Sequence, residues 1–184
     1  MKKTLFLLTA CMFFLTSCSN EKQFDGDLQM ACQKTNKTFQ ASTLVCKQIS
    51  DTRRTAIFDN KTPSGKYCSD FNEALKELFE SYSESGILDS INSFRNSMQV
   101  ATSKLNNPPS SRTDCYNDFV EIVSDVSSIS RMATDPTGSL STYYSQVNET
   151  AENISKKIDR FKINYAQFIN SEKNISTFAH AENT

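Results

Sequence analysis

The sequence has few of the residues from which active sites are usually built. It has one histidine, His180, and no cysteine or acidic pair stands near it at metal-ligand spacing. Serine and threonine are abundant, but no histidine is available to act as their base, and no GxSxG, SxxK or glycine-rich phosphate-binding motif occurs. We therefore expect no catalytic residues, no metal and no cofactor, and we expect that the chain is not an enzyme.

An excess of positive charge is also absent. The chain has 20 basic and 21 acidic residues, which gives a net charge of −1 at pH 7. Proteins that bind nucleic acids use clustered lysine and arginine to neutralise phosphates. Nucleic acid is therefore not an expected partner.

Glycine and proline are scarce, with four of each in the chain. They stand where the apolar periodicity breaks, at Pro63-Ser64-Gly65, Pro108-Pro109 and Pro136-Thr137-Gly138, and these breaks predict loops. Between the loops apolar residues recur every three or four positions, and no stretch alternates for long enough to be a strand. The pattern predicts an all-α fold, an elongated antiparallel bundle with helices near 28–57, 68–106, 112–133 and 138–178.

The range 138–178 has the clearest helical pattern. Its apolar positions follow spacings of four and three, as in a coiled coil, and about forty residues at 1.5 Å each would extend about 60 Å. We therefore predict a long coiled-coil-like C-terminal helix, with Ile158 and Phe161 buried and Lys157 facing water. The predicted seam, in which Glu172 is the one polar residue, consists of Leu140, Tyr144, Val147, Ala151, Ile154, Ile158, Phe161, Tyr165, Phe168, Glu172 and Ile175.

Two details concern the middle helices. The apolar seam of 68–106 shifts by one residue at Gly86, and glycine lowers helix propensity, so a bend is expected there. The helix at 112–133 is expected to begin behind Ser110, Ser111 or Thr113 as its capping residue.

The N-terminus has the features of an export signal. Two lysines precede an apolar run of about eleven residues at 5–15, which is too short to span a bilayer. The run ends in Leu15-Thr16-Ser17-Cys18. This tetrapeptide resembles the lipobox of bacterial lipoproteins, in which the cysteine receives diacylglycerol before the signal is cleaved.

The resemblance implies an envelope location. Residues 1–17 would be removed as the signal, and lipid on Cys18 would hold the chain on a membrane. Ser19 is not the aspartate that favours inner-membrane retention in enterobacteria, so the outer membrane is favoured, with the protein facing the periplasm or the surface. Removing 17 of 184 residues leaves 167, and removing two lysines leaves 18 basic against 21 acidic residues, a net charge of −3. The polar residues 18–27 are expected to form a lipidated tether, 28–178 the bundle and 179–184 a polar tail.

Four cysteines lie in the expected bundle: Cys32, Cys46, Cys68 and Cys115. An even number in an exported chain indicates two disulfides, with a metal site or free thiols as the alternatives, and no close CxxC pair suggests zinc. Cys32 and Cys46 would be about 21 Å apart on one continuous helix, so they cannot pair. The up-and-down order of the helices favours Cys32 with Cys115 and Cys46 with Cys68, provided that 51–66 folds back over Cys46.

Two acidic stripes are possible binding surfaces, because their spacing of three and four places each on one solvent face of a helix. A solvated surface is the simpler interpretation, although like charges at this spacing are mildly unfavourable unless a partner offsets them. Opposite charge gathers at Lys156, Lys157, Arg160 and Lys162. The stripes consist of Asp70, Glu73, Glu77, Glu80 and Glu84, and of Asp114, Asp118, Glu121 and Asp125.

These observations predict a lipid-anchored envelope protein that acts as a non-enzymatic binding or scaffold module for a protein partner. One alternative is an inhibitor or exclusion factor that engages a cationic protein or peptide through the acidic faces. A third is a weak enzyme or an accessory domain of an envelope hydrolase, which the missing catalytic residues disfavour.

Overall fold

In the computed structural model the structure describes residues 2–169, with side chains from residue 20 onward. The predicted all-α fold is confirmed, and the only β-type pairing in this range is an isolated bridge between Lys61 and Tyr67. The helices are α1 (Lys2–Asp59), α2 (Phe71–Glu84), α3 (Ile87–Ser103), the 3-10 turn η1 (Ser110–Arg112), α4 (Thr113–Thr134) and α5 (Leu140–Tyr165).

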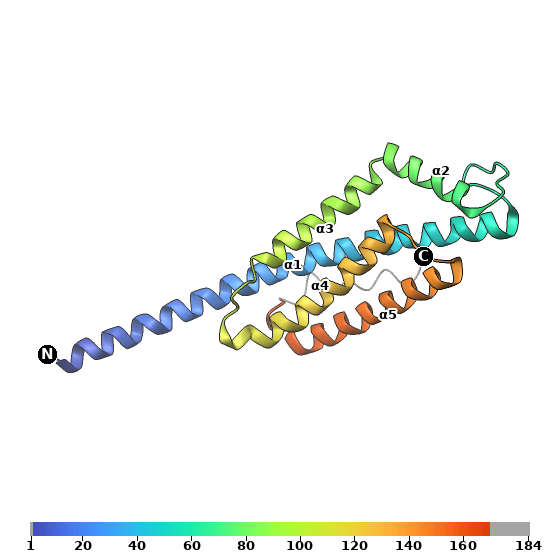
Figure 1. The fold of residues 1–184 in the computed structure, drawn as a ribbon. Helices are drawn as coiled ribbons and strands as arrows, with labels where there is room; N and C mark the ends of the chain where they lie inside the picture. Colours follow the sequence, from blue (N-terminus) through green and yellow to red (C-terminus); the bar gives the residue numbers. More distant parts are fainter. Residues whose placement is uncertain (1, 170–184) are drawn as a thin grey trace.

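The molecule is elongated along helix α1, and α2, α3, α4 and α5 all pack against this helix (Figure 1). In Figure 1 the chain runs from left to right along α1 and returns to the left through α2 and α3. It then runs to the right in α4 and back to the left in α5, as the antiparallel bundle was predicted to do. Helices α3 and α5 lie on opposite sides of the α1–α4 pair. No helix within the described residues is both long and apolar enough to cross a membrane.

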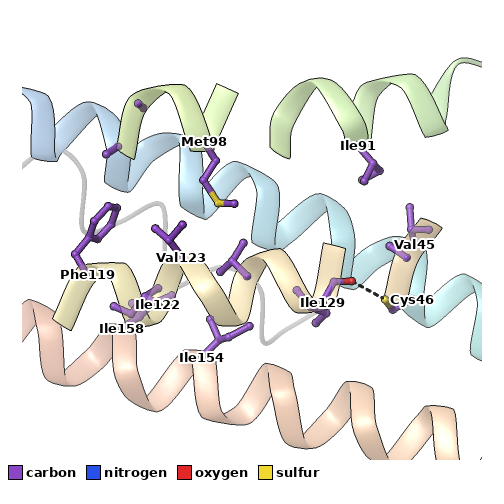
Figure 2. Close-up of a cluster of buried hydrophobic side chains, with 14 of the residues drawn as sticks. Val45, Cys46, Ile91, Met98, Phe119, Ile122, Val123, Ile129, Ile154 and Ile158 are labelled. Atoms are coloured by element: carbon purple, nitrogen blue, oxygen red, sulfur yellow. Dashed lines mark hydrogen bonds between the residues drawn. The ribbon is translucent and has the colours of Figure 1, made fainter. Parts of the chain in front are cut away.

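The core follows the helical periodicity of the sequence. Figure 2 shows Ile122 and Ile129 of α4 facing Ile154 and Ile158 of α5, while Met98 of α3 approaches from the other side. All five side chains are buried. Each buried isoleucine or methionine contributes on the order of 1.5–3 kcal/mol through removal of apolar surface from water.

Helix α1 also buries small polar residues at its contacts with the other helices. Thr35 and Thr38 are buried, and each hydroxyl donates to the carbonyl four residues earlier, at 2.8 Å. Ser50 does the same to the Cys46 carbonyl at 3.0 Å. These hydroxyls are thereby satisfied inside the helix, so they can lie in the core without the cost of an unpaired donor.

The predicted seam of the last helix is right at its centre and wrong at its start. Ile158 and Phe161 are buried, as predicted, but Tyr143 is 1% exposed where Tyr144 was expected, and Tyr144 is 57% exposed. Tyr143 fits the core because its hydroxyl donates to the Met132 carbonyl at 3.0 Å. Helix α5 ends at Tyr165, earlier than predicted. The remainder of the seam at Glu172 and Ile175, His180 and the tail at 179–184 lie outside the described residues.

The predicted bend at Gly86 is present. Helix α2 ends at Glu84 and α3 begins at Ile87, with Gly86 between them at φ 72°, a left-handed conformation that glycine adopts without steric cost. The expected serine or threonine cap of the next helix is absent, because α4 follows η1 directly and its N-terminus has no side-chain cap. Ser111 instead donates to a carboxylate oxygen of Glu21 at 2.7 Å.

The expected tether at 18–27 is instead part of α1. Phe24 is 6% exposed and belongs to the core with Leu28 and Ala31, a spacing of four and three that continues the buried face of the helix. Asp25 is held by Arg112. Residues 21–25 therefore pack in the bundle.

Candidate functional site

All four cysteines described in the structure are free thiols. Cys46 donates to the Ile129 carbonyl at 3.6 Å, whereas Cys68 is buried against Ala56 and Ala74 (Figure 2 shows Cys46). Ala56 lies ten residues beyond Cys46 on α1, or about 15 Å along its axis. The predicted Cys46–Cys68 disulfide is therefore wrong, because a disulfide requires Cα atoms within about 7 Å.

Cys32 and Cys115 have a different relationship. Helices α1 and α4 run parallel, and the contact between Cys46 and Ile129 joins positions 83 apart in sequence, the same separation as from 32 to 115. Cys32 and Cys115 thus lie at the same level of neighbouring helices. Burial raises the pKa of both thiols to about 12, and Cys115 adds to the effect on Cys32. The pairing of these two thiols as a disulfide stays a prediction.

The acidic stripe of α2 is used within the fold. Asp70 caps α2 by accepting hydrogen bonds from two backbone amides of its first turn, and Glu73 accepts from the amide and hydroxyl of Ser69. Glu77 accepts from the Ser64 amide at 2.7 Å. Burial raises the pKa of Glu77, but the hydrogen bonds from Ser64 and Thr62 outweigh it and lower the pKa overall. Glu80 pairs with Lys76 at 3.9 Å, and Glu84 is exposed at the end of the helix.

The acidic stripe of α4 joins α4 to α5. Lys157 pairs with Glu121 at 3.3 Å and with Asp125 at 2.9 Å, and the hydrogen bond to Asp125 is the main cause that raises the pKa of Lys157. Asp118 accepts a hydrogen bond from the Tyr165 hydroxyl at 2.9 Å. The prediction that Lys157 faces water is wrong, since its side chain is 23% exposed. Asp114 is exposed in the first turn of α4.

Arg112, the last residue of η1, lies at one end of the bundle and contacts both α1 and the segment that follows α5. Its guanidinium makes two hydrogen bonds to Asp25, at 2.9 and 3.2 Å, and lies 3.7 Å from Glu21. The same group lies over the ring of Phe168, 3.7 Å from its centre. The hydrogen bond to Asp25 is the main cause that raises the pKa of Arg112.

At the opposite end Arg53 is 2% exposed and takes part in no ion pair among the described residues. Its guanidinium donates to the carbonyls of Gly138 and Pro136, at 3.2 and 3.1 Å. It also lies over the rings of Tyr143 and Phe71, at 4.7 and 5.4 Å. Burial lowers the pKa of Arg53. The contacts join α1 to the α4–α5 loop and to the start of α2.

Beyond Arg53, exposed aromatic and basic side chains gather at the end of α1 and on the loop that follows. We call this group the distal tip. Phe58 is 71% and Tyr67 78% exposed, although large apolar side chains are usually covered. The distal tip consists of Arg54, Ile57, Phe58, Lys61, Lys66 and Tyr67, all exposed.

The loop of the distal tip has a defined backbone. The Thr62 amide donates to the Lys66 carbonyl at 2.8 Å, and the Cys68 amide donates to the Asn60 carbonyl at 3.0 Å. Gly65 supplies the turn with a φ of 83°. Thr62 and Cys68 are buried, which fixes both sides of the loop against the bundle. The aromatic side chains are thus displayed on an ordered scaffold.

A second surface feature is a groove between α1 and α3, with a cavity of about 560 Å³. Met30 and Val100 lie on its apolar part, and Lys34 and Lys104 border it. Both apolar side chains are substantially exposed, at 45% and 61%. None of the residues that line the groove is aromatic, whereas the distal tip has two exposed aromatic side chains.

Sequence reasoning did not identify the distal tip. The signal was present in α1, whose buried residues Ile49, Arg53 and Ala56 follow spacings of four and three, so that Phe58 falls off the buried face. Tyr67 lies in a loop, where periodicity gives no information about exposure.

Chemically the described residues offer binding surfaces. Among the side chains that the structure describes, from residue 20 to residue 169, no group of three or more histidine, cysteine, aspartate or glutamate residues is placed to hold a metal ion. No protein-family model, curated protein or solved structure matches this chain.

Proposed function

We propose that the chain is a non-enzymatic binding protein of the bacterial envelope, anchored by lipid on Cys18 and binding its partner at the distal tip. The observation that carries the proposal is that Cys18 and the first part of the distal tip, Arg54 to Phe58, lie far apart on the single helix α1. From position 18 to position 59 is 41 residues, or about 60 Å of helix. The anchor would thus be at one end of the molecule and the binding surface at the other.

Two further observations support this proposal. The apolar side chains of the distal tip are exposed on an ordered loop, which is typical of binding residues positioned by a rigid scaffold. The acidic stripes have less capacity for a cationic partner, because most of their carboxylates accept hydrogen bonds or pair with lysine inside the chain. The inhibitor alternative therefore has weaker support.

The anchor is tested by labelling cells with a fatty-acid analogue and measuring the mass of the mature N-terminus. We expect the wild-type chain to begin at Cys18 with attached acyl groups and to fractionate with the outer membrane. Cys18→Ala should remain uncleaved and unlabelled. Normal labelling of this variant would refute the anchor.

The binding surface is tested by placing a photo-crosslinking amino acid at position 58 or, as a control, at position 44. Leu44 is 58% exposed on the same helix, about 21 Å from Phe58. We expect a crosslinked product from position 58 and none from position 44. Products that are equal at both positions would contradict a binding role for the distal tip.

A further inference from the structure

We propose that the distal tip binds a polymer of pyranose sugars that carries carboxylates, the chemistry of a bacterial cell wall. The aromatic rings of Phe58 and Tyr67 would contact the sugars, and the basic residues would contact the carboxylates. The inference rests on the proposed function, because it names the partner of the distal tip.

The first argument is the kind of apolar surface that the distal tip offers. The rings of Phe58 and Tyr67 are 71% and 78% exposed, on segments joined by the Lys61–Tyr67 bridge. An aromatic face is electron-rich, and it stacks favourably on the C–H groups that form the flat face of a pyranose ring. Aromatic side chains with two rotatable bonds also lose little conformational entropy on binding.

The second argument is charge. From residue 54 to residue 67 the chain has three basic side chains, Arg54, Lys61 and Lys66, and one acidic side chain, Asp59, whereas the whole chain has a net charge of −1. Of the carboxylates on the neighbouring helix α2, Glu77 accepts from the Ser64 amide of this loop, and Asp70 caps the helix. The segment 54–67 itself has an excess of two cations, which fits a partner that carries carboxylates.

The third argument concerns size and position. The apolar part of the distal tip has only three side chains, which is small for a stable protein interface that buries about 800 Å² on each partner. A chain with its anchor on Cys18 and α1 directed away from the bilayer holds the distal tip about 60 Å from that bilayer. A polymer beside the membrane fits this reach better than the anchoring membrane itself.

The test measures co-sedimentation of the full chain, extracted from cell membranes in detergent, with purified cell-wall sacculi. An uncharged N-acetylglucosamine oligomer and phosphatidylglycerol vesicles are the comparison probes. We expect saturable binding to sacculi, competition by the oligomer at high concentration, and no binding to the vesicles. Phe58→Ser and Tyr67→Ser should each weaken binding about tenfold, the effect expected when a central contact residue is truncated.

The control variant is Leu44→Ser, which removes a 58% exposed apolar side chain from α1 outside the distal tip and should leave binding unchanged. Lys61→Ala and Lys66→Ala should weaken binding about two- to threefold and reduce its salt dependence, because exposed ion pairs are individually weak. Thermal melts confirm that each variant remains folded.

Three results would overturn the inference. They are the absence of binding to sacculi, an equal loss of binding in Leu44→Ser, and binding to the vesicles in place of the sacculi. The assay does not depend on the lipid, so a chain that is not acylated at Cys18 but still binds sacculi refutes only the anchor. A chain acylated at Cys18 that crosslinks to a protein through position 58 and ignores sacculi refutes only the glycan partner.

Discussion

The two ends of the bundle are each held by an arginine, but the two side chains have opposite surroundings. Arg112, of η1, meets Asp25 and Glu21 of α1 and is partly open to solvent. Arg53, near the end of α1, is buried and meets only carbonyl oxygens and aromatic faces. The comparison shows that the same residue type can act as an ion-pair partner at one end and as a hydrogen-bonding core residue at the other.

The difference has consequences for the surface at each end. Arg112 holds the turn of α1 at Glu21 and Asp25 against η1, whereas the contacts of Arg53 connect α1 to α2 and to the α4–α5 loop. The distal tip begins at Arg54, the next residue. The geometry of the distal tip should therefore depend on a buried contact that salt does not screen.

The largest effect should come from the apolar core at the Arg112 end. Phe161 is 4% exposed and lies 5.8 Å from the ring of Phe119 and 4.9 Å from that of Tyr165. Phe161→Asp would bury a charge among aromatic rings, and we expect a loss of about 3–5 kcal/mol in the free energy of unfolding. Denaturant titration measures it. Tyr144→Asp, on the exposed side of α5, is the control, and equal losses would mean that α5 packs in another register.

The next largest effect on stability should come from a disulfide between Cys32 and Cys115, near the Arg112 end of the bundle. We expect Cys32 and Cys115 to form a disulfide in the exported protein and Cys46 and Cys68 to remain thiols. Loss of the bridge on reduction should lower stability by about 2–4 kcal/mol. Peptide mapping without reductant identifies the pairing. Recovery of all four cysteines as thiols from the exported protein would contradict the bridge.

Arg53→Met should cost about 2 kcal/mol, because two hydrogen bonds from a charged donor are lost and the carbonyls of Pro136 and Gly138 lose their partner. The methionine retains most of the volume, so the loss reports on polar contacts. Melting curves at low and high salt should show the same difference from wild type. A difference that shrinks with salt would indicate that Arg53 is not buried as described.

Arg112→Met should have the smallest effect, about 1 kcal/mol at low ionic strength, because its partners are partly exposed and its ion pairs are screened. The variant leaves Glu21 and Asp25 without a cation, so added salt should narrow the gap from wild type. Melting curves across a salt series measure the trend. An effect independent of salt would remove the contrast between the two arginines.

Much of the fold could be predicted from the sequence, because periodicity and chain breaks are local signals. The four prolines, Gly65 and Gly138 mark the turns between helices, and the phase change at Gly86 marks the bend, whereas Gly26 lies within α1. The polar composition of 18–27 predicts a tether, whereas these residues continue α1, and Asp25 contacts Arg112, 87 positions away. Local composition carries no information about such a contact.

The prediction of the site was limited for the same reason, because spacing along one helix carries no information about contacts between helices. Spacing correctly placed the acidic stripes on two helices, but it could not show that Lys157 of α5 reaches Glu121 and Asp125 of α4. At the start of the α5 seam, residue type alone could not distinguish Tyr143 from its neighbour Tyr144. Tyr143 and not Tyr144 is buried, because it alone reaches the Met132 carbonyl and the face of Arg53.

The continuity of α1 has a mechanical consequence. With lipid on Cys18, a pull on a partner bound at the distal tip would pass along the axis of one helix to the membrane, through hydrogen bonds that lie parallel to the load. No interface between helices would have to bear that tension in shear. The remaining helices would restrain α1 from bending or unwinding, and we expect the first failure under load in the exposed last turn of α1, residues 57–59.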